Sequence, residues 1–194
     1  MPRQIEYDPV ALKQNLLSVF WLQGYAETSL TELEAATGLN RRQLYNGVGD
    51  KRDMFIQSLD EFCDFAGRSF LAALETEDAG LADIERLLQS FLDAAERSDG
   101  PNGCMVCSTS QEEIASDPDV KVRVDAYFDR IRAAYRNTLS RAAARGDVAL
   151  TDPEIDLRTE ALFGTHVALC ILGRAGRPHA QLTQMVRQAL NDVC

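Results

Sequence analysis

Two neighbouring arginines are the first residues in this chain whose type and spacing suggest a chemistry. Arg41 and Arg42 lie in the stretch GLNRRQLYNGVGDK, in a chain with a formal net charge of -10. A guanidinium group can pair with guanine O6 and N7 or with a phosphate oxygen, and the amides of Gln43 and Asn46 can read adenine. We therefore treat these four side chains as candidate contacts with double-stranded DNA.

Four soft side chains form a second candidate group. Cys104 and Cys107 share the spacing i, i+3, and His166 and Cys170 are one helical turn apart. Three interpretations are open: small buried core residues, a redox switch that uses the Cys104/Cys107 pair, or four ligands for zinc. We favour the core interpretation, so the prediction includes no metal and no cofactor.

Enzyme chemistry has little support in the sequence. A CxxC thiol oxidoreductase is a distant alternative, because that chemistry requires a strand before the motif and no strand pattern precedes Cys104. The chain carries no metal-hydrolase, phosphate-loop or nucleotide-fingerprint spacing, and it has two histidines, His166 and His179. We predict no catalytic residue.

The charge is unevenly distributed. Residues 1–55 carry six Lys/Arg against seven Asp/Glu, and the remainder carries 14 against 23. Because four of those six cations lie between positions 41 and 52, a local basic patch can exist on an acidic body. The N-terminus has no apolar segment typical of a secretion signal, and the longest uncharged run, residues 161–173, is too short to span a bilayer. We expect a cytoplasmic protein with no membrane partner and with its five cysteines reduced.

Apolar residues recur with helical periodicity along the whole chain, so we predict an all-α protein. Nine helices are expected at about residues 8–23, 29–38, 40–47, 50–70, 84–95, 104–116, 120–146, 154–174 and 178–193. N-caps are expected at Asp8, Ser29, Asn40 and Asp50, and the loop at 98–103 separates the fifth helix from the sixth. We predict two domains, residues 1–52 and residues 53–194.

The second and third helices have the spacing of a helix-turn-helix. The short turn Thr37-Gly38-Leu39-Asn40 joins them, and Arg41 and Arg42 lie at the leading end of the second one. In this motif the second helix enters the major groove of DNA. The alternative interpretation is a solvated surface turn between two capped helices.

The span GYAETSLTELEAATGLNRRQLYNGVGDKRDMF resembles the DNA-binding domain of the TetR/AcrR family of bacterial transcriptional regulators. The resemblance implies that Arg41, Arg42, Gln43 and Asn46 meet base edges. It also implies that Thr28, Tyr45 and Lys51 contact phosphates. The chain departs from the family pattern at Gly47, where histidine is usual, and at Val48, where phenylalanine is common; the missing histidine removes one contact with the DNA backbone.

The same resemblance extends more loosely over the C-terminal part and implies a homodimer formed through the last two helices. It also implies that a small apolar or amphipathic effector binds inside the C-terminal helices. We take as candidate lining residues Phe62, Phe65, Phe91, Cys107, Tyr127, Phe163, His166 and Cys170, with ordinary core as the alternative interpretation.

These observations together predict a ligand-responsive DNA-binding regulator. We expect a dimeric repressor that binds a palindromic operator and is released by its effector. The alternatives kept open are a regulator that senses redox state, or zinc, through Cys104 and Cys107, and more distantly the thiol oxidoreductase.

Overall fold

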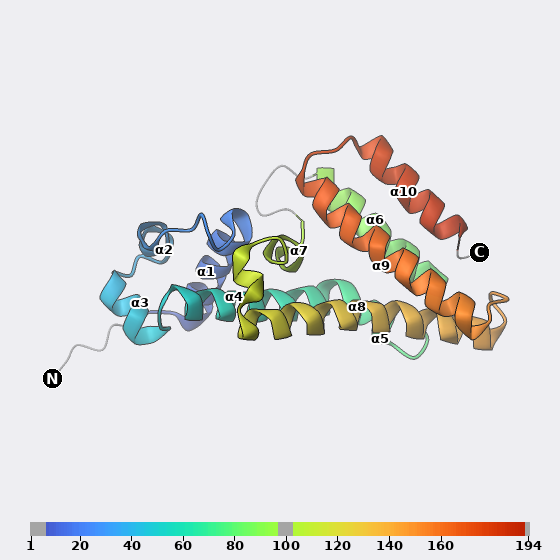
Figure 1. Cartoon of the computed structure of the whole chain (residues 1–194), viewed down its shortest axis with the longest axis horizontal. Helices are drawn as coiled ribbons and strands as arrows, with labels where there is room; N and C mark the ends of the chain where they lie inside the picture. Colours follow the sequence, from blue (N-terminus) through green and yellow to red (C-terminus); the bar gives the residue numbers. More distant parts are fainter. Residues whose placement is uncertain (1–6, 97–102, 193–194) are drawn as a thin grey trace.

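The computed structural model describes residues 7–96 and 103–192, and within these two stretches all regular structure is helical (Figure 1). The elements are α1 (Pro9–Gln23), α2 (Leu30–Thr37), α3 (Arg41–Gly47), α4 (Lys51–Ala66), the π-helix η1 (Gly67–Leu71), α5 (Ala72–Glu75), α6 (Leu81–Glu96), α7 (Met105–Thr109), the 3₁₀-helix η2 (Glu113–Ser116), α8 (Pro118–Arg145), α9 (Asp152–Arg174) and α10 (His179–Asn191). The predicted all-α class is confirmed. Because α4, η1 and α5 follow one another without a break, the described residues contain nine α-helical stretches, as predicted.

The predicted N-caps begin the first four helices. The carboxylate of Asp8 accepts the backbone N–H of Val10, at the start of α1. The other three caps form reciprocal capping boxes, in which the cap side chain and the residue three positions later bond each other's backbone N–H: Ser29 with Glu32, Asn40 with Gln43, and Asp50 with Asp53. The local sequence therefore fixes where these helices begin.

The predicted helix at 104–116 is wrong in its second half. Only α7 and the short η2 form there, with a turn between them. The hydroxyl of Ser110 donates to the carbonyl of Cys107 at 2.8 Å, and the amide of Gln111 donates to the same carbonyl at 3.0 Å. Side-chain donors of this kind occupy carbonyls that a longer helix would need.

Two predicted features fall partly outside the described residues. Of the loop at 98–103 only Gly103 is described, and Val193 of the last helix lies beyond residue 192. In the described part of the chain, no helix is long and apolar enough to cross a bilayer.

The small helices α1 to α3 lie at one end of the molecule, and α6, α9 and α10 pack together at the other (Figure 1). Helix α4 joins the two ends. Near its start Phe55 packs against Phe20 at 5.3 Å between ring centroids, and further along Phe62 packs against Tyr127 of α8 at 6.2 Å. The hydrophobic core is therefore continuous across the boundary predicted at residues 52 and 53, which stays a prediction.

Candidate functional site

The turn between α2 and α3 presents one face of α3 to solvent. Gly38 ends α2 in the left-handed conformation (φ 71°), which glycine adopts without strain. Leu33, Leu39 and Leu44 are buried beneath the turn and hold the two helices together. The opposite face of α3 is exposed and carries Arg41, Arg42, Tyr45 and Asn46.

These four exposed side chains have no hydrogen-bond or ion-pair partner among the described residues. Tyr45 is 42% exposed, although tyrosine usually buries most of its ring. Two cations and two hydrogen-bonding side chains thus share one solvent-facing surface at the end of the molecule. We call Arg41, Arg42, Tyr45 and Asn46 the reading face.

Gln43 departs from its predicted role. Its side-chain carbonyl accepts the backbone N–H of Asn40 at 2.7 Å, and its own backbone N–H donates to the Asn40 side chain at 3.1 Å. A bidentate contact with adenine needs both the carbonyl and the amino group of the side chain. Because the carbonyl is occupied by the cap, Gln43 in this conformation cannot read adenine in that way.

Thr28 also differs from its prediction as a phosphate contact. Its side chain is 2% exposed, and its hydroxyl donates to the carbonyl of Gly24 at 2.6 Å. It therefore holds the turn between α1 and α2 and offers almost no side-chain surface to DNA. Lys51 remains half-buried at the start of α4, with its ammonium 4.5 Å from the centre of the Tyr25 ring.

A chain of ring contacts leads from the end of α1 into the larger part of the molecule. Trp21 packs edge-on against Phe62 at 4.9 Å and lies 6.0 Å from Phe65. From Phe65 the contacts continue to Phe70 at 5.9 Å, from Phe70 to Phe91 at 5.9 Å, and from Phe91 to His166 at 4.5 Å. The contacts draw in five of the predicted lining residues: Phe62, Phe65, Phe91, Tyr127 and His166. The prediction missed Trp21 and Phe70, and helical periodicity alone gave no sign that the end of α1 reaches this region.

His166 is buried in the core beside a tyrosine. Its Nδ1 is hydrogen-bonded to the hydroxyl of Tyr135, with 3.1 Å between the two atoms, and both side chains are at most 2% exposed. Burial lowers the pKa of His166 to about 4, because the charged imidazolium would lose its hydration. The pair is therefore neutral at pH 7.

Three of the predicted thiols lie close together around this histidine. Cys104, Cys107 and Cys170 are all buried. Burial by itself would raise the pKa of Cys104, but the thiols of Cys107 and Cys170 can donate to its sulfur and hold its pKa well below the usual range. For the same reason the pKa values of Cys107 and Cys170 are raised, since they share their protons with Cys104. The three thiols therefore form one hydrogen-bonded cluster around Cys104.

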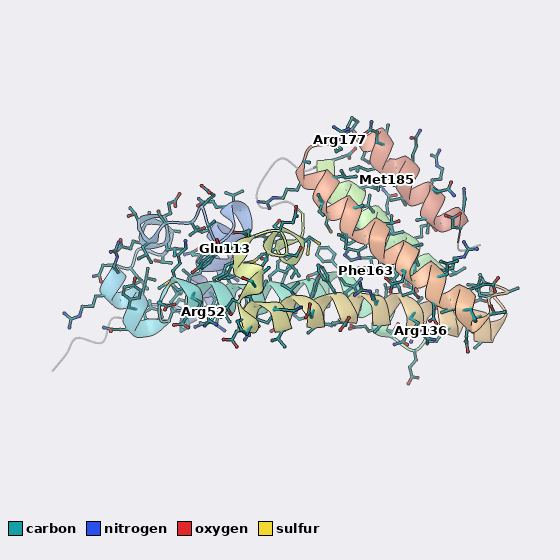
Figure 2. The ribbon with its side chains drawn as sticks, in the orientation of Figure 1. Arg52, Glu113, Arg136, Phe163, Arg177 and Met185 are labelled. Carbon is teal, nitrogen blue, oxygen red and sulfur yellow. The ribbon has the colours of Figure 1, made fainter. Side chains whose placement is uncertain are left out.

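Phe163 does not join the other predicted lining residues. Its ring packs against Phe128 at 5.6 Å and lies under the guanidinium of Arg132 at 3.8 Å. Figure 2 shows Phe163 between α8 and α9, on a side chain that extends from α9 toward α8. We therefore remove it from the candidate effector region. We define that region by the three thiols and the connected rings, which are those of Trp21, Phe62, Phe65, Phe70, Phe91, Tyr127 and His166.

The zinc alternative is not supported. Within residues 7–96 and 103–192, no group of three or more His, Cys, Asp or Glu side chains is arranged to hold a metal ion. The oxidoreductase alternative lacks its structural context too, because no strand precedes Cys104 in the described chain.

One segment connects the thiol cluster to the end of α1, the turn between α1 and α2, and the start of α4. The indole N–H of Trp21 donates to the carbonyl of Gly103 at 3.1 Å, and the carboxylate of Glu112 accepts the backbone N–H of Ala26 at 2.9 Å. At the far end of the segment, Arg52 forms two hydrogen bonds with Asp117, at 2.6 and 2.8 Å. Arg52 holds the pKa of Asp117 at about 2. We call residues 103–117 the connecting segment; Figure 2 labels Arg52 and Glu113 where it meets α4.

The fold and the site together define a helical protein with an N-terminal helix-turn-helix and a larger helical domain that encloses an aromatic, thiol-containing region. Comparison with known proteins identifies the family. The family model described as "Tetracyclin repressor-like, C-terminal domain" matches residues 80–189, more than half of the chain. The chain belongs to the TetR family of DNA-binding transcriptional regulators.

Individual relatives agree with this assignment. The chain is 23% identical over 174 residues to the HTH-type transcriptional regulator YezE of Bacillus subtilis, covering 90% of each chain. It is 24% identical over 190 residues to the HTH-type transcriptional repressor ComR of Escherichia coli, covering 95% of this chain and 88% of ComR.

Solved structures share the fold. A cysteine mutant of the TetR family regulator CifR in complex with a 26-bp operator duplex superposes with a TM-score of 0.85, at 22% identity over 97% of this chain and 98% of that one. A TetR regulator from Chloroflexus aurantiacus gives a TM-score of 0.79, at 22% identity over 93% of this chain and 90% of that one.

Proposed function

We propose that this regulator is a repressor that binds a palindromic operator as a homodimer and is released when a small apolar or amphipathic effector enters the candidate effector region. The observation that carries the DNA half is the reading face, in which the exposed side of α3 concentrates two unpaired guanidinium groups on a chain of net charge -10. ComR is named a repressor, and the CifR structure contains operator DNA; both support the proposal.

In this proposal the residues of the DNA-binding surface have separate roles. Arg41, Arg42 and Asn46 contact base edges from α3. Tyr45 and Lys51 contact phosphates on either side of it, and the phosphate contacts fix the register while the base contacts select the sequence. Thr28 and Gln43 leave this set and act by shaping the turn and capping α3.

Dimerisation through α9 and α10 is supported by a face of α9 that is uncovered in the single chain. Leu157 is 68% exposed and Ile171 is 37% exposed, and both lie on this one face of α9. Between them on the same face lie Ala161, Gly164 and Ala168, at the spacing i, i+4, i+7, i+11, i+14 counted from Leu157. The small residues let a second helix approach closely, and a C₂ dimer would place two reading faces on one side of the DNA.

The effector half rests on the connecting segment. An effector that separates the rings around His166 would push on α7. On either side of α7, the connecting segment contacts the N-terminal part of the chain at Trp21, Ala26 and Arg52. A ligand shifts the equilibrium only if it fits one arrangement better than the other. The connecting segment offers a continuous physical route for that shift.

The DNA half is tested by two alanine variants and one matched control. Arg42→Ala should change base preference, because a lost bidentate contact removes about 1–3 kcal/mol of discrimination. Lys51→Ala should weaken binding evenly across sequences and reduce the slope of log K against log salt by about 2, because each subunit of the dimer loses one phosphate contact. Arg86→Ala removes one exposed cation from α6, away from α3, and should do neither. Anisotropy titrations on duplexes selected from a random pool measure all three variants; unchanged binding by both Arg42→Ala and Lys51→Ala would reject the docking.

A redox-sensing regulator is the second candidate, because Cys104 begins a helix beside two other thiols and has a lowered pKa. Oxidation of a Cys104/Cys107 pair would remove two hydrogens per chain. Mass spectrometry of protein purified without reductant measures that loss, and Cys107→Ser should abolish it. A fully reduced wild-type chain after treatment with hydrogen peroxide would reject this candidate.

A further inference from the structure

Tyr7, which precedes α1, lies against the last residue of α3. Its hydroxyl oxygen is 2.8 Å, and its ring carbon Cζ 3.4 Å, from the position that a Cβ on Gly47 would occupy. Real Cβ atoms do not approach other atoms to 2.8 Å, so any side chain at position 47 would displace the phenol. Gly47 therefore leaves room for the end of the Tyr7 side chain, which would have to shift if position 47 carried a Cβ.

The hydroxyl of Tyr7 is available for an intermolecular contact. The residue is 36% exposed, and the hydroxyl has no hydrogen-bond partner among the described residues. Its ring lines a small pocket of about 90 Å³ together with Lys13 at the start of α1 and Val48 after α3. The side chain of Lys13 is 56% exposed, and its ammonium lies 3.8 Å from a carboxylate oxygen of Glu61, which is a weak pair. A neutral donor and a cation thus line the same pocket next to the C-terminal end of α3.

We propose that Tyr7 is a DNA-positioning residue whose hydroxyl donates a hydrogen bond to a backbone phosphate beside the C-terminal end of α3. The inference rests on the proposed docking of α3 and extends it to a residue outside the helix-turn-helix. Gly47 has no side chain and cannot make a contact there, and its lack of a Cβ is what lets the phenol occupy that place. Tyrosine hydroxyls are common donors to DNA phosphates, and such contacts fix orientation without reading sequence.

The test uses variants that remove the hydroxyl, displace it or replace it. The probes are a 30-bp duplex selected by the wild-type protein from a random pool and a scrambled duplex of the same composition. Tyr7→Phe should weaken binding to both duplexes by about 10- to 100-fold, the loss of one hydrogen bond in each of the two subunits, with their affinity ratio and the salt slope unchanged. Gly47→Ala should weaken binding at least as much, because the new methyl group displaces the phenol.

A double variant tests the pairing itself. Tyr7→Ala with Gly47→His removes the ring and places an imidazole N–H donor in the vacated space, so affinity should return to within about 3-fold of wild type. Gly47→His alone keeps the Tyr7 phenol in the space that the imidazole needs, so its DNA affinity should stay below that of wild type. The melting temperature of each variant is measured alongside, since an exposed hydroxyl contributes little to stability.

Each outcome decides one question. If Tyr7→Phe binds DNA as tightly as wild type, the inference is wrong, whether or not Gly47→Ala binds DNA more weakly. If Tyr7→Phe binds like wild type while Arg42→Ala still changes base preference, the docking of α3 stands and only the role of Tyr7 is wrong. If Tyr7→Phe changes the ratio between the two duplexes, its hydroxyl reads sequence, and the positioning role is equally wrong.

Discussion

The buried His166 should make the stability of this protein depend on pH in a way that a single substitution removes. In the unfolded chain an imidazole has a pKa near 6.5, and in the folded chain burial lowers the pKa of His166 to about 4. Between these values the unfolded state binds more protons. Lowering the pH therefore favours unfolding, and the contribution is complete above about pH 7 and lost as the pH falls toward 4.

The size of the effect follows from the two pKa values. For one group the difference in unfolding free energy between pH 7 and pH 5 is about 2 kcal/mol, and it approaches about 3 kcal/mol near pH 4. Carboxylates also titrate in this range, so the total change in the wild-type protein mixes several groups. The contribution of His166 must be isolated by comparison with a variant that keeps the hydrogen bond and cannot be protonated.

His166→Asn is that variant. The amide of asparagine can occupy the place of Nδ1 and keep a partner for the Tyr135 hydroxyl, which is 3.1 Å from Nδ1 in the wild-type chain. We expect wild type to lose about 2 kcal/mol more than His166→Asn between pH 7 and pH 5, measured by urea unfolding at one fixed protein concentration. His179→Asn, at the exposed start of α10, is the matched control for removing an imidazole.

Parallel stability curves for wild type and His166→Asn would refute the reasoning. They would mean that His166 is protonated in the folded protein at pH 5, and hence that water or a counter-charge reaches it. A lower but parallel curve for His166→Asn would report a packing loss alone and would also count against the buried neutral pair.

Two further predictions concern the dimer and the connecting segment. Leu157→Glu should convert the protein to a monomer at micromolar concentration, because it places a charge on the exposed apolar face of α9. Analytical ultracentrifugation measures the oligomeric state. A persistent dimer would mean that the interface lies elsewhere. Glu112→Ala should raise the rate of hydrogen exchange at the Ala26 amide at least about 10-fold, because Glu112 accepts that N–H at 2.9 Å. Exchange rates in α10 should stay unchanged. An unchanged rate at Ala26 would show that this contact does not hold the turn.

The sequence alone determined the starts of the first helices and the position of the turn between α2 and α3. Asp8, Ser29, Asn40 and Asp50 each bond a backbone N–H two or three residues away, so the information lies within one helical turn. The capping role of Gln43 was equally local and could have been inferred from its position three residues after Asn40.

The tertiary structure decided which side chains meet, because those contacts depend on how helices far apart in the sequence cross. Phe163 and Phe91 look alike in the sequence, yet Phe163 lies under Arg132 on α8 and Phe91 reaches His166. Trp21 enters the effector region only because α1 ends beside α4. Tyr7 reaches Gly47 across forty residues for the same reason: the path of the chain into α1, and not any local pattern, puts a phenol where α3 has no side chain.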